Sequence, residues 1–398
     1  MKLIKKFKFI NTILMVVIIT EVIFISYHLI NKKEKYIYFD GINAITSNDN
    51  YYVGVGSNND NDMHFEKAKV SIYNTKKDKV NDIIYNIGYN SSFFGVVLDN
   101  NDIVAVGSYE EDISDREDSV RKALIVKYDK SGKILFQKDF ELLNNSRFTS
   151  IVKYKDYYYV TGQSVYKSTE LGNKSGGAIL CKYNKNGKLI WCKSYGSNKS
   201  AIYNELLVYN NNLYVVGSDE GYLGIICKYD LDGNIIRYDN YKSTDDIGFS
   251  GIINIGSNIY VSGSNRSGDN NTAMIAMYDD NCNYIKENVY KTDKTSRYNK
   301  LVVDDNNDII VIGTIYMENV VNHNIINDYN YDGMIGKYSS DLEKIDAVKY
   351  GDERDDYFTD IIFSNNKYIV AGYSSYEDGS YMSKFINYSK ALKVLEVE

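Results

Sequence analysis

Carboxylates are the first residues of this 398-residue chain that suggest chemistry, because they gather in one short stretch. Residues 109–118 are YEEDISDRED. Carboxylate oxygens are the ligands that calcium prefers in proteins, so we interpret this stretch as a candidate cation-binding loop. Its acidic residues are Glu110, Glu111, Asp112, Asp115, Glu117 and Asp118.

A shorter acidic segment, DLDGN at residues 230–234, has the Asp-x-Asp-Gly spacing of a calcium loop. A full calcium loop has about 12 residues and closes with a bidentate acid, which this segment lacks. Asp, Asn and Gly also favour tight turns, so we expect a turn there. The histidines, at positions 28, 64 and 323, are too few and too scattered for a zinc site. We therefore expect no cofactor, with calcium at the acidic loop as the alternative.

A second candidate site is aromatic and lies between residues 314 and 332. Planar rings are suited to stacking on a sugar or a peptide, so we expect a protein or a glycan as the partner. The alternative is a loop with incidental tyrosines, because the chain has 40 of them. The candidate binding residues are Tyr316, Met317, His323, Tyr329 and Tyr331.

Sequence motifs of catalysis do not occur. The chain contains no Gly-x-Ser-x-Gly, no His-Glu-x-x-His and no phosphate-binding glycine loop. Residues 164–167 match Ser-x-x-Lys, but the companion motifs of that chemistry are absent. We therefore predict no catalytic residue, although carboxylates brought together from distant segments leave no motif along a chain.

The four cysteines raise the question of disulfides. Cys181 and Cys227 occupy equivalent positions in successive repeats, and Cys192 lies on the strand expected to pair with that of Cys181. A bulged turn at residues 184–188 would place Cys181 opposite Trp191, which argues against a bridge between Cys181 and Cys192. We expect buried free thiols that act as small apolar side chains.

Charge is divided unevenly along the chain. The formal net charge is −7, but residues 1–35 carry seven lysines against two glutamates, or +5, which leaves −12 for the remainder. Binding to nucleic acid requires a basic surface, so an acidic domain argues against a nucleic-acid partner.

An apolar segment near the N-terminus predicts membrane attachment. Residues 9–30, FINTILMVVIITEVIFISYHLI, would rise about 33 Å as a helix, enough to cross the hydrocarbon core. No small residues mark a cleavage site, so we expect an uncleaved signal anchor with a cytoplasmic basic tail at residues 1–8. The rest of the chain would then lie outside the cytoplasmic membrane, attached by a single span.

Internal repeats organise everything after residue 35. A strand that ends in glycine recurs every 46 to 59 residues, at Gly56, Gly107, Gly162, Gly217, Gly263, Gly313 and Gly372. A second strand follows each glycine and ends in an aromatic residue, at Tyr73, Tyr128, Tyr183, Tyr229, Tyr278, Tyr338 and Phe385. A further aromatic residue lies 14 or 15 positions before most of the glycines, at Phe93, Phe148, Tyr203, Phe249, Tyr298 and Phe358.

These repeats predict an all-β fold. Turns such as DKSG and NKNG follow the terminal aromatic residue, and their glycine supplies the positive φ of a hairpin bulge before a fourth strand. Each unit of about 52 residues has the length of a propeller blade. We therefore expect residues 31–398 to form a seven-bladed β-propeller of four-stranded antiparallel blades, preceded by one transmembrane helix.

The repeats resemble the bacterial β-propeller repeat of the SBBP type. The resemblance is best in YGDERDDYFTDIIFSNNKYIVAGYSS at residues 350–375 and in YKSTDDIGFSGIINIGSNIYVSGS at residues 241–264. It covers nearly all of the chain beyond residue 40, and it implies a propeller at the surface of a bacterial cell. Such repeats occur in proteins of many uses, so the resemblance implies a fold and no particular activity.

Two functions remain open from these observations. The first is a non-enzymatic binding or scaffolding module that presents a propeller at the cell surface. The second is an extracellular hydrolase or lyase that acts on a glycan through carboxylates gathered at the propeller axis. Long connections between second and third strands, at residues 108–122, 163–177 and 314–332, share one face of the ring, and this face is the expected binding face.

Overall fold

The segments marked by glycine and by aromatic residues form β-strands in the computed structural model, except that Phe385 lies outside the residues that it describes. It describes residues 41–60, 65–74, 79–88, 90–111, 120–143, 145–165, 177–196, 201–219, 223–241, 247–267, 270–318, 329–351, 355–374 and 395–397. Every regular element in these ranges is a strand, and none is a helix. The expected all-β class is confirmed.

The structure describes 27 strands. The first sixteen are β1 (Ile42–Ser47), β2 (Tyr51–Asp60), β3 (Phe65–Asn74), β4 (Lys79–Tyr85), β5 (Ser91–Asp99), β6 (Asp102–Glu110), β7 (Arg121–Tyr128), β8 (Ile134–Phe140), β9 (Asn145–Tyr154), β10 (Tyr157–Val165), β11 (Gly177–Asn184), β12 (Leu189–Tyr195), β13 (Ile202–Tyr209), β14 (Asn212–Ser218), β15 (Gly224–Asp230) and β16 (Ile235–Asn240). The remainder are β17 (Ile247–Ile255), β18 (Asn258–Ser267), β19 (Asn270–Tyr278), β20 (Tyr284–Val289), β21 (Ser296–Val303), β22 (Ile309–Glu318), β23 (Tyr329–Tyr338), β24 (Lys344–Tyr350), β25 (Asp356–Ser364), β26 (Lys367–Ser374) and β27 (Leu395–Val397).

Successive strands pair antiparallel in groups of four. Sheets β1 to β4, β13 to β16, β17 to β20 and β21 to β24 each run in chain order, and β25, β26 and β27 form a three-stranded sheet. A single parallel bridge between Arg121 and Asn145 joins β5 to β8 with β9 to β12 into one eight-stranded sheet. The predicted repeat of four-stranded antiparallel sheets is therefore confirmed.

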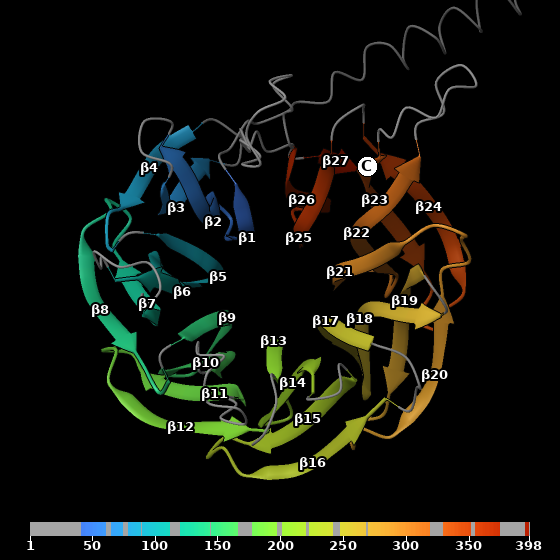
Figure 1. Cartoon of the computed structure of the whole chain (residues 1–398), viewed down its shortest axis with the longest axis horizontal. Coiled ribbons are helices and arrows are strands. Elements are labelled where there is room, and N and C mark those ends of the chain that lie inside the picture. The colour runs from blue at the N-terminus through green and yellow to red at the C-terminus, as the bar shows by residue number, and fades with distance from the viewer. Residues whose placement is uncertain are drawn as a thin grey trace, which may run out of the picture. The chain divides into compact units, whose positions relative to one another are not determined.

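The sheets stand around a common centre (Figure 1). The first strand of each group is innermost, and the fourth strand lies at the rim. Contacts between first strands run from β1 through β5, β9, β13, β17 and β21 to β25, and β25 contacts β1. The ring is thus closed by the first and last sheets. All of these strands belong to one compact unit, residues 37–398.

Polar side chains of the innermost strands fasten neighbouring sheets together. Asn204 on β13 donates to the backbone oxygen of Phe249 at 2.7 Å, and Asn299 on β21 donates to that of Phe358 at the same distance. Thr359 on β25 donates to the oxygen of Ile42 at 2.8 Å, across the closure of the ring. These bonds recur at one position of the repeat, so polar side chains join neighbouring sheets near the centre of the ring.

Glycine is required within each second strand because the backbone of the first strand approaches it closely. At Gly162 a Cβ atom would collide with the carbonyl oxygen of Arg147, and at Gly217 with that of Ile202. A bulge in the first strand causes this approach. The residue directly opposite the glycine is the recurring aromatic residue, as in the Phe148–Gly162 pair. The glycine and the aromatic residue 14 or 15 positions before it therefore face each other across one strand pair.

The aromatic markers pack together. The ring of Phe148 meets that of Tyr183 edge to face at 6.2 Å, and Tyr203 meets Tyr229 in the same way at 6.3 Å. Where both rings are tyrosines, their hydroxyls bond to each other, at 2.6 Å for Tyr203 and Tyr229. Where the first ring is phenylalanine, the buried hydroxyl of the second has no hydrogen-bond partner among the described residues, as at Tyr183. Much of the tyrosine content therefore serves the fold.

The turns between third and fourth strands have the predicted conformation, but the register beyond them is different. Gly132, Gly187 and Gly233 have φ values of 90°, 77° and 80°, as expected. In the third unit, however, Tyr183 pairs with Leu189 and Lys182 with Trp191, so one extra residue is bulged on the fourth strand.

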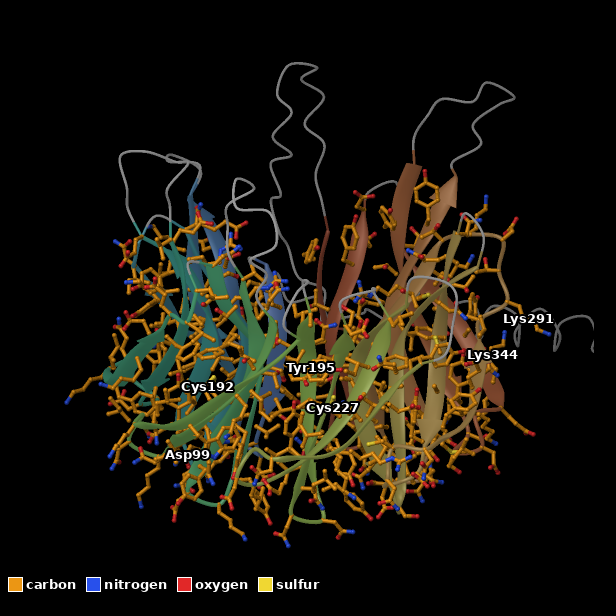
Figure 2. All side chains as sticks on the ribbon, turned by 60° about the horizontal axis from the view of Figure 1, so that its bottom comes forward. Asp99, Cys192, Tyr195, Cys227, Lys291 and Lys344 are labelled. Atoms are coloured by element: carbon orange, nitrogen blue, oxygen red, sulfur yellow. A yellow bond between two sulfur atoms is a disulfide. The ribbon has the colours of Figure 1, made fainter. Side chains whose placement is uncertain are left out.

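That bulge corrects the cysteine prediction. It shifts the pairing by one residue, so Cys181 lies opposite Cys192 and the two form a disulfide. The prediction against a bridge was wrong because it assumed that the pairing set by the turn continues unchanged along the strand. Cys227 and Cys282 are buried free thiols, as expected. Cys192 and Cys227 are labelled in Figure 2.

The connections between second and third strands are shorter than predicted. The strand β22 continues to Glu318 and β23 begins at Tyr329, so both strands extend into the expected loop at residues 314–332. Likewise β6 reaches Glu110 and β7 begins at Arg121. Hydrogen bonding between the hairpin strands continues past the point where the sequence becomes polar. We call the side of the ring where second strands end and third strands begin the long-loop face.

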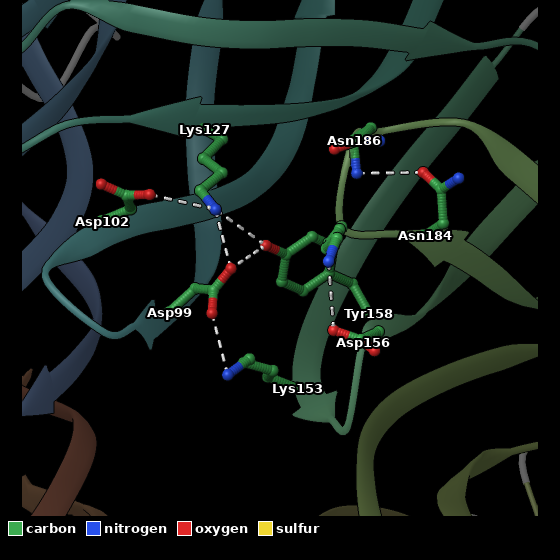
Figure 3. Close-up of polar contacts among 9 residues, drawn as sticks. Asp99, Asp102, Lys127, Lys153, Asp156, Tyr158, Asn184 and Asn186 are labelled. Atoms are coloured by element: carbon green, nitrogen blue, oxygen red, sulfur yellow. Dashed lines mark hydrogen bonds and ion pairs between the residues drawn. The ribbon is translucent and has the colours of Figure 1, made fainter.

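A buried ionic clasp joins the second and third groups of strands (Figure 3). Asp99, at the end of β5, accepts hydrogen bonds from Lys127 at 2.7 Å and from Tyr158 on β10 at 2.5 Å. Lys153 pairs with the second carboxylate oxygen of Asp99 at 2.8 Å. Asp102 pairs with Lys127 at 3.1 Å. Burial alone would raise the pKa of Asp99, but the bonds from Lys127, Lys153 and Tyr158 hold it well below its usual range.

Membrane attachment is not addressed by the described residues. The expected helix at residues 9–30 and the basic tail at residues 1–8 lie outside them. Among the residues that the structure describes, none belongs to a helix with the length and apolar character needed to cross a membrane.

Candidate functional site

Four tyrosines form a continuous aromatic surface where two sheets meet on the long-loop face. Tyr316 on β22 and Tyr331 on β23 are directly paired, with ring centroids 5.3 Å apart. Tyr331 reaches across to Tyr357 on β25 at 5.4 Å, and Tyr357 lies 4.9 Å from Tyr373 on β26. All four side chains are half-buried, so each presents part of its ring outward. We call this set the tyrosine cluster.

The structure therefore brings together two of the five residues predicted for the aromatic site. Tyr316 and Tyr331 lie on strands and not on a loop. Met317 pairs with Asn330 and Tyr329 with Glu318 through their backbones in the same hairpin. His323 lies outside the described residues.

Sequence reasoning missed Tyr357 and Tyr373. Both belong to the next repeat and pair with each other, one residue away from the aligned Phe358–Gly372 pair. The signal was available in outline, because the residues beside the aromatic and glycine markers lie on neighbouring strands. Their contact with Tyr331 depends on how two sheets pack, which no spacing along the chain reveals.

Two glutamates of the candidate cation-binding loop are paired with basic residues. Arg121 pairs with Glu110 at 2.5 Å, and Lys122 pairs with Glu111 at the same distance. Lys122 also lies 3.5 Å from Glu141. The other acidic residues of the candidate cation-binding loop, Asp112, Asp115, Glu117 and Asp118, lie outside the described residues. A calcium site there remains a prediction that depends on those four.

The predicted turn at Asp230 forms as expected. Its Oδ1 accepts hydrogen bonds from the backbone of Asp232 at 2.9 Å and of Asn234 at 2.8 Å, and its Oδ2 accepts one from the Asn234 side chain. The carboxylate is therefore used by its own turn. Within the described ranges, no group of three or more His, Cys, Asp or Glu side chains is placed to hold a metal ion.

Three charged residues meet on the innermost strands, and we call them the axial cluster. They are Glu205 on β13, Lys300 on β21 and Asp360 on β25, each two positions after the aromatic residue that faces a glycine. The Lys300 ammonium pairs with Oε1 of Glu205. Sequence analysis missed this cluster because its members are separated by 60 to 155 positions and come from three different sheets.

Every carboxylate oxygen of the axial cluster has a partner. The backbone N–H of Ile252 donates to Glu205 Oε2 at 3.1 Å, so Glu205 also binds the neighbouring sheet. The N–H groups of Ile45 and Ile361 donate to the two oxygens of Asp360 at 2.8 and 2.9 Å. The bond from Ile45 crosses the closure between β1 and β25. The cluster therefore fastens several of the sheets together.

Burial governs the electrostatics of the cluster. It raises the pKa of Asp360 and of Glu205 above their usual values, although Lys300 acts in the opposite direction on both. Burial would lower the pKa of Lys300, but the charges of Glu205 and Asp360 raise it, so the lysine stays protonated. One cation thus compensates two carboxylates in a site that is largely withdrawn from water.

Comparisons with known proteins place the fold. No protein-family model matches the chain, and no curated protein matches it in sequence. Among solved structures, the chain is similar to Sqt1 from Chaetomium thermophilum, with a TM-score of 0.52 and 11% identity over 92% of this chain and 90% of that one. It is also similar to hydrazine synthase of Kuenenia stuttgartiensis, with a TM-score of 0.53 and 9% identity over 86% and 95% of the two chains.

A third similarity is to the β-propeller domain of the Trilobed protease from Pyrococcus furiosus, with a TM-score of 0.47 and 12% identity over 86% and 95% of the two chains. The structural neighbours are β-propeller proteins with repeated four-stranded sheets. Identities this low show the fold alone, so function has to be argued from the sites of this chain.

Proposed function

We propose that this chain is a non-enzymatic binding or scaffolding module, a seven-bladed β-propeller held outside the cytoplasmic membrane by a signal anchor at residues 9–30. The count of seven is supported by the cyclic contacts of the first strands, from β1 to β25 and back to β1. The repeat segments at residues 241–264 and 350–375 support assignment to the SBBP type.

Partner binding is assigned to the long-loop face. The observation that carries this assignment is the tyrosine cluster, because four half-buried rings from two sheets form one surface on a rigid ring. Aromatic side chains provide large contact areas at low cost in side-chain entropy, and they dominate binding energy at many interfaces. A protein or a glycan at the cell surface fits such a surface.

The axial cluster argues against catalysis. Its carboxylate oxygens are already bonded to Lys300 and to backbone N–H groups of neighbouring sheets, so they hold the ring together. One observation favours the alternative, an extracellular glycan hydrolase or lyase. Burial raises the pKa of both Glu205 and Asp360, which is the direction that a general acid requires. Hydrolysis of cell-surface glycans by the purified chain would favour that alternative.

The disulfide supports a location outside the cytoplasm. Disulfides persist in oxidising compartments and are rare in the cytosol, and Cys181 and Cys192 form one between β11 and β12. Protease added to intact cells should degrade the propeller. A thiol-reactive reagent added before lysis should not label Cys181 or Cys192, because neither has a free thiol. Full protection from protease, with both thiols labelled, would contradict this topology.

Loss of partner capture tests the binding face. Replacing Tyr316, Tyr331 and Tyr357 with alanine should abolish retention of partners from a cell-surface extract while the melting temperature changes by only a few degrees. The matched control replaces Tyr238, an exposed tyrosine on the rim strand β16, and should leave capture intact. Equal capture by the triple variant and the wild type would reject the assignment.

A further inference from the structure

The junction between β16 and the following sheet differs from the two junctions before it. Phe136, Trp191 and Arg237 occupy equivalent positions, each directly opposite a lysine of the third strand. The ring of Phe136 lies against Gly187, and that of Trp191 lies against Gly233, so close that an added Cβ would meet ring atoms at 2.6 and 2.9 Å. These aromatic rings fill the outer part of their junctions.

At the next junction the filler is absent, because Arg237 takes the place of the ring. A cavity of about 490 Å³ lies there, a volume within the range of small-molecule sites. One wall comes from the chain at Arg237, Asp239 and Tyr241, which alternate on one side of β16 and its continuation. The other wall comes from the end of β19, the following turn and the first residue of β20, and its residues are Tyr278, Cys282, Asn283 and Tyr284. We call this cavity the rim slot.

The aromatic wall of the rim slot consists of three tyrosine rings. Tyr278 is fully buried, and its hydroxyl has no hydrogen-bond partner among the described residues. That hydroxyl lacks a partner because Phe249 stands where other sheets have a second tyrosine, as Phe148 does beside Tyr183. The rings of Tyr241 and Tyr278 each meet that of Tyr284 edge to face, at 5.9 and 5.8 Å. Tyr284 itself is 46% exposed, so the slot is open to solvent on that side. The wall thus offers flat apolar surface.

The polar wall carries both signs of charge. The Arg237 guanidinium donates one hydrogen bond to Asn283 at 2.8 Å and retains further N–H donors. Asp239 supplies acceptor oxygens two residues along the same strand. Burial raises the pKa of the Cys282 thiol to about 12, so the sulfur is protonated and is no nucleophile. The slot is therefore equipped for binding and not for covalent chemistry.

We propose that the rim slot binds a neutral polyhydroxylated ring of monosaccharide size, such as one sugar unit of a cell-surface glycan. Hydroxyl groups both donate and accept, so a sugar can accept from Arg237 and donate to Asp239. A ligand with a net charge would meet a like charge on one side of the slot. The apolar face of a sugar ring matches the tyrosine wall. This site lies along β16, β19 and β20, whereas the tyrosine cluster lies on β22, β23, β25 and β26, so it stands or falls independently of the binding surface proposed above.

Direct binding of simple sugars tests the proposal. Saturation-transfer NMR and calorimetry on the full chain, in a detergent without a sugar head group, would use glucose, galactose, mannose and N-acetylglucosamine as probes. We expect saturable binding of at least one of them in the millimolar range. Absence of saturable binding for all four would overturn the proposal.

Substitutions locate the site. Arg237→Trp should fill the slot as Trp191 fills its own junction and reduce affinity at least tenfold, whereas the same change at the equivalent position of β20, Lys286→Trp, should leave it unchanged. Arg237→Ala should weaken binding about threefold to tenfold, by loss of hydrogen bonds from the guanidinium, and it keeps the test valid if the tryptophan variant fails to fold. Wild-type affinity in both Arg237→Trp and Arg237→Ala would place the binding elsewhere and overturn the proposal.

Discussion

At the junction that follows β12 and at the junction that follows β16, a lysine of the third strand donates to a backbone carbonyl oxygen of the next sheet. The side chains that fill the two junctions differ. Lys182 donates to the carbonyl oxygen of Leu231 at 3.0 Å in the first, and Lys228 donates to that of Asp280 at 2.7 Å in the second. The first is filled by Trp191, whereas the second holds Arg237 beside a cavity. The spacing of the sheets is therefore set by backbone anchors and inner-strand bonds. The outer filler can vary without changing the ring, which leaves that position available for function.

The largest loss of stability is expected one junction earlier, at the ionic clasp between the group β5 to β8 and the group β9 to β12. Replacing Asp99 with asparagine removes the charge that Lys127 and Lys153 share, and losing one member of a buried pair costs about 3 kcal/mol. We expect the free energy of unfolding, measured in urea at pH 7, to fall by that amount. A loss of less than about 0.5 kcal/mol would show that the clasp is in effect a surface pair.

The same variant makes a pH-dependent prediction. The pKa of Asp99 is lowered in the folded state, so the unfolded chain takes up the proton first as the pH falls. The stability from the clasp is therefore present above the ordinary aspartate pKa of 3.8 and is lost below it. Between about pH 5 and pH 3, the wild type should lose more stability than Asp99→Asn. Parallel pH profiles of the two proteins would contradict this origin.

The contents of the two junctions differ in what they contribute. Trp191→Ala should destabilise the protein by about 2 to 3 kcal/mol, less than for a fully buried tryptophan because the side chain is partly exposed. At the equivalent position, Arg237→Ala should change stability by less than about 0.5 kcal/mol, because no packed ring is lost. Equal losses at the two positions would show that Arg237 is also a structural filler.

The smallest expected change in stability concerns the tyrosine hydroxyls, which are bonded in tyrosine–tyrosine pairs and lack that bond in phenylalanine–tyrosine pairs. Tyr298 and Tyr338 have ring centroids 6.1 Å apart and bonded hydroxyls, and Phe249 and Tyr278 have nearly the same ring geometry at 6.2 Å. Phe249→Tyr should therefore stabilise the protein by about 1 kcal/mol, and Tyr298→Phe should destabilise it by a similar amount. If Phe249→Tyr proves destabilising, the space beside Tyr278 is too small for a second hydroxyl.

The sequence markers anticipate the strands and the sheets because each marker reflects a contact that repeats within a unit. The glycine is required by the close approach of a neighbouring strand, and the aromatic residues pack on one another, so both recur with the unit. The position of Cys181 opposite Cys192 was predicted incorrectly, because one bulged residue beyond the turn shifts the register. The spacing of residues along the sequence does not predict a shift of one residue in the pairing of two strands.

The candidate sites were only partly predictable for a different reason. Tyr316 and Tyr331 lie on one hairpin, so the sequence could bring them together, whereas Tyr357 joins them through packing between sheets. The axial cluster depends on three first strands that meet near the centre of the ring. The rim slot depends on what is missing, a ring at the position of Arg237, which is visible only beside its filled equivalents.

The central claim of a binding propeller with structural axial acids is tested most directly by one paired measurement. Partner capture from a cell-surface extract would be compared between Glu205→Gln with Asp360→Asn and Tyr331→Ala with Tyr357→Ala, at temperatures where the wild type and both variants are folded. We predict that the axial variant captures partners as the wild type does, with a lower melting temperature, and that the tyrosine variant captures none. Full capture by the tyrosine variant, together with loss of capture or of glycan hydrolysis in the axial variant, would contradict the account.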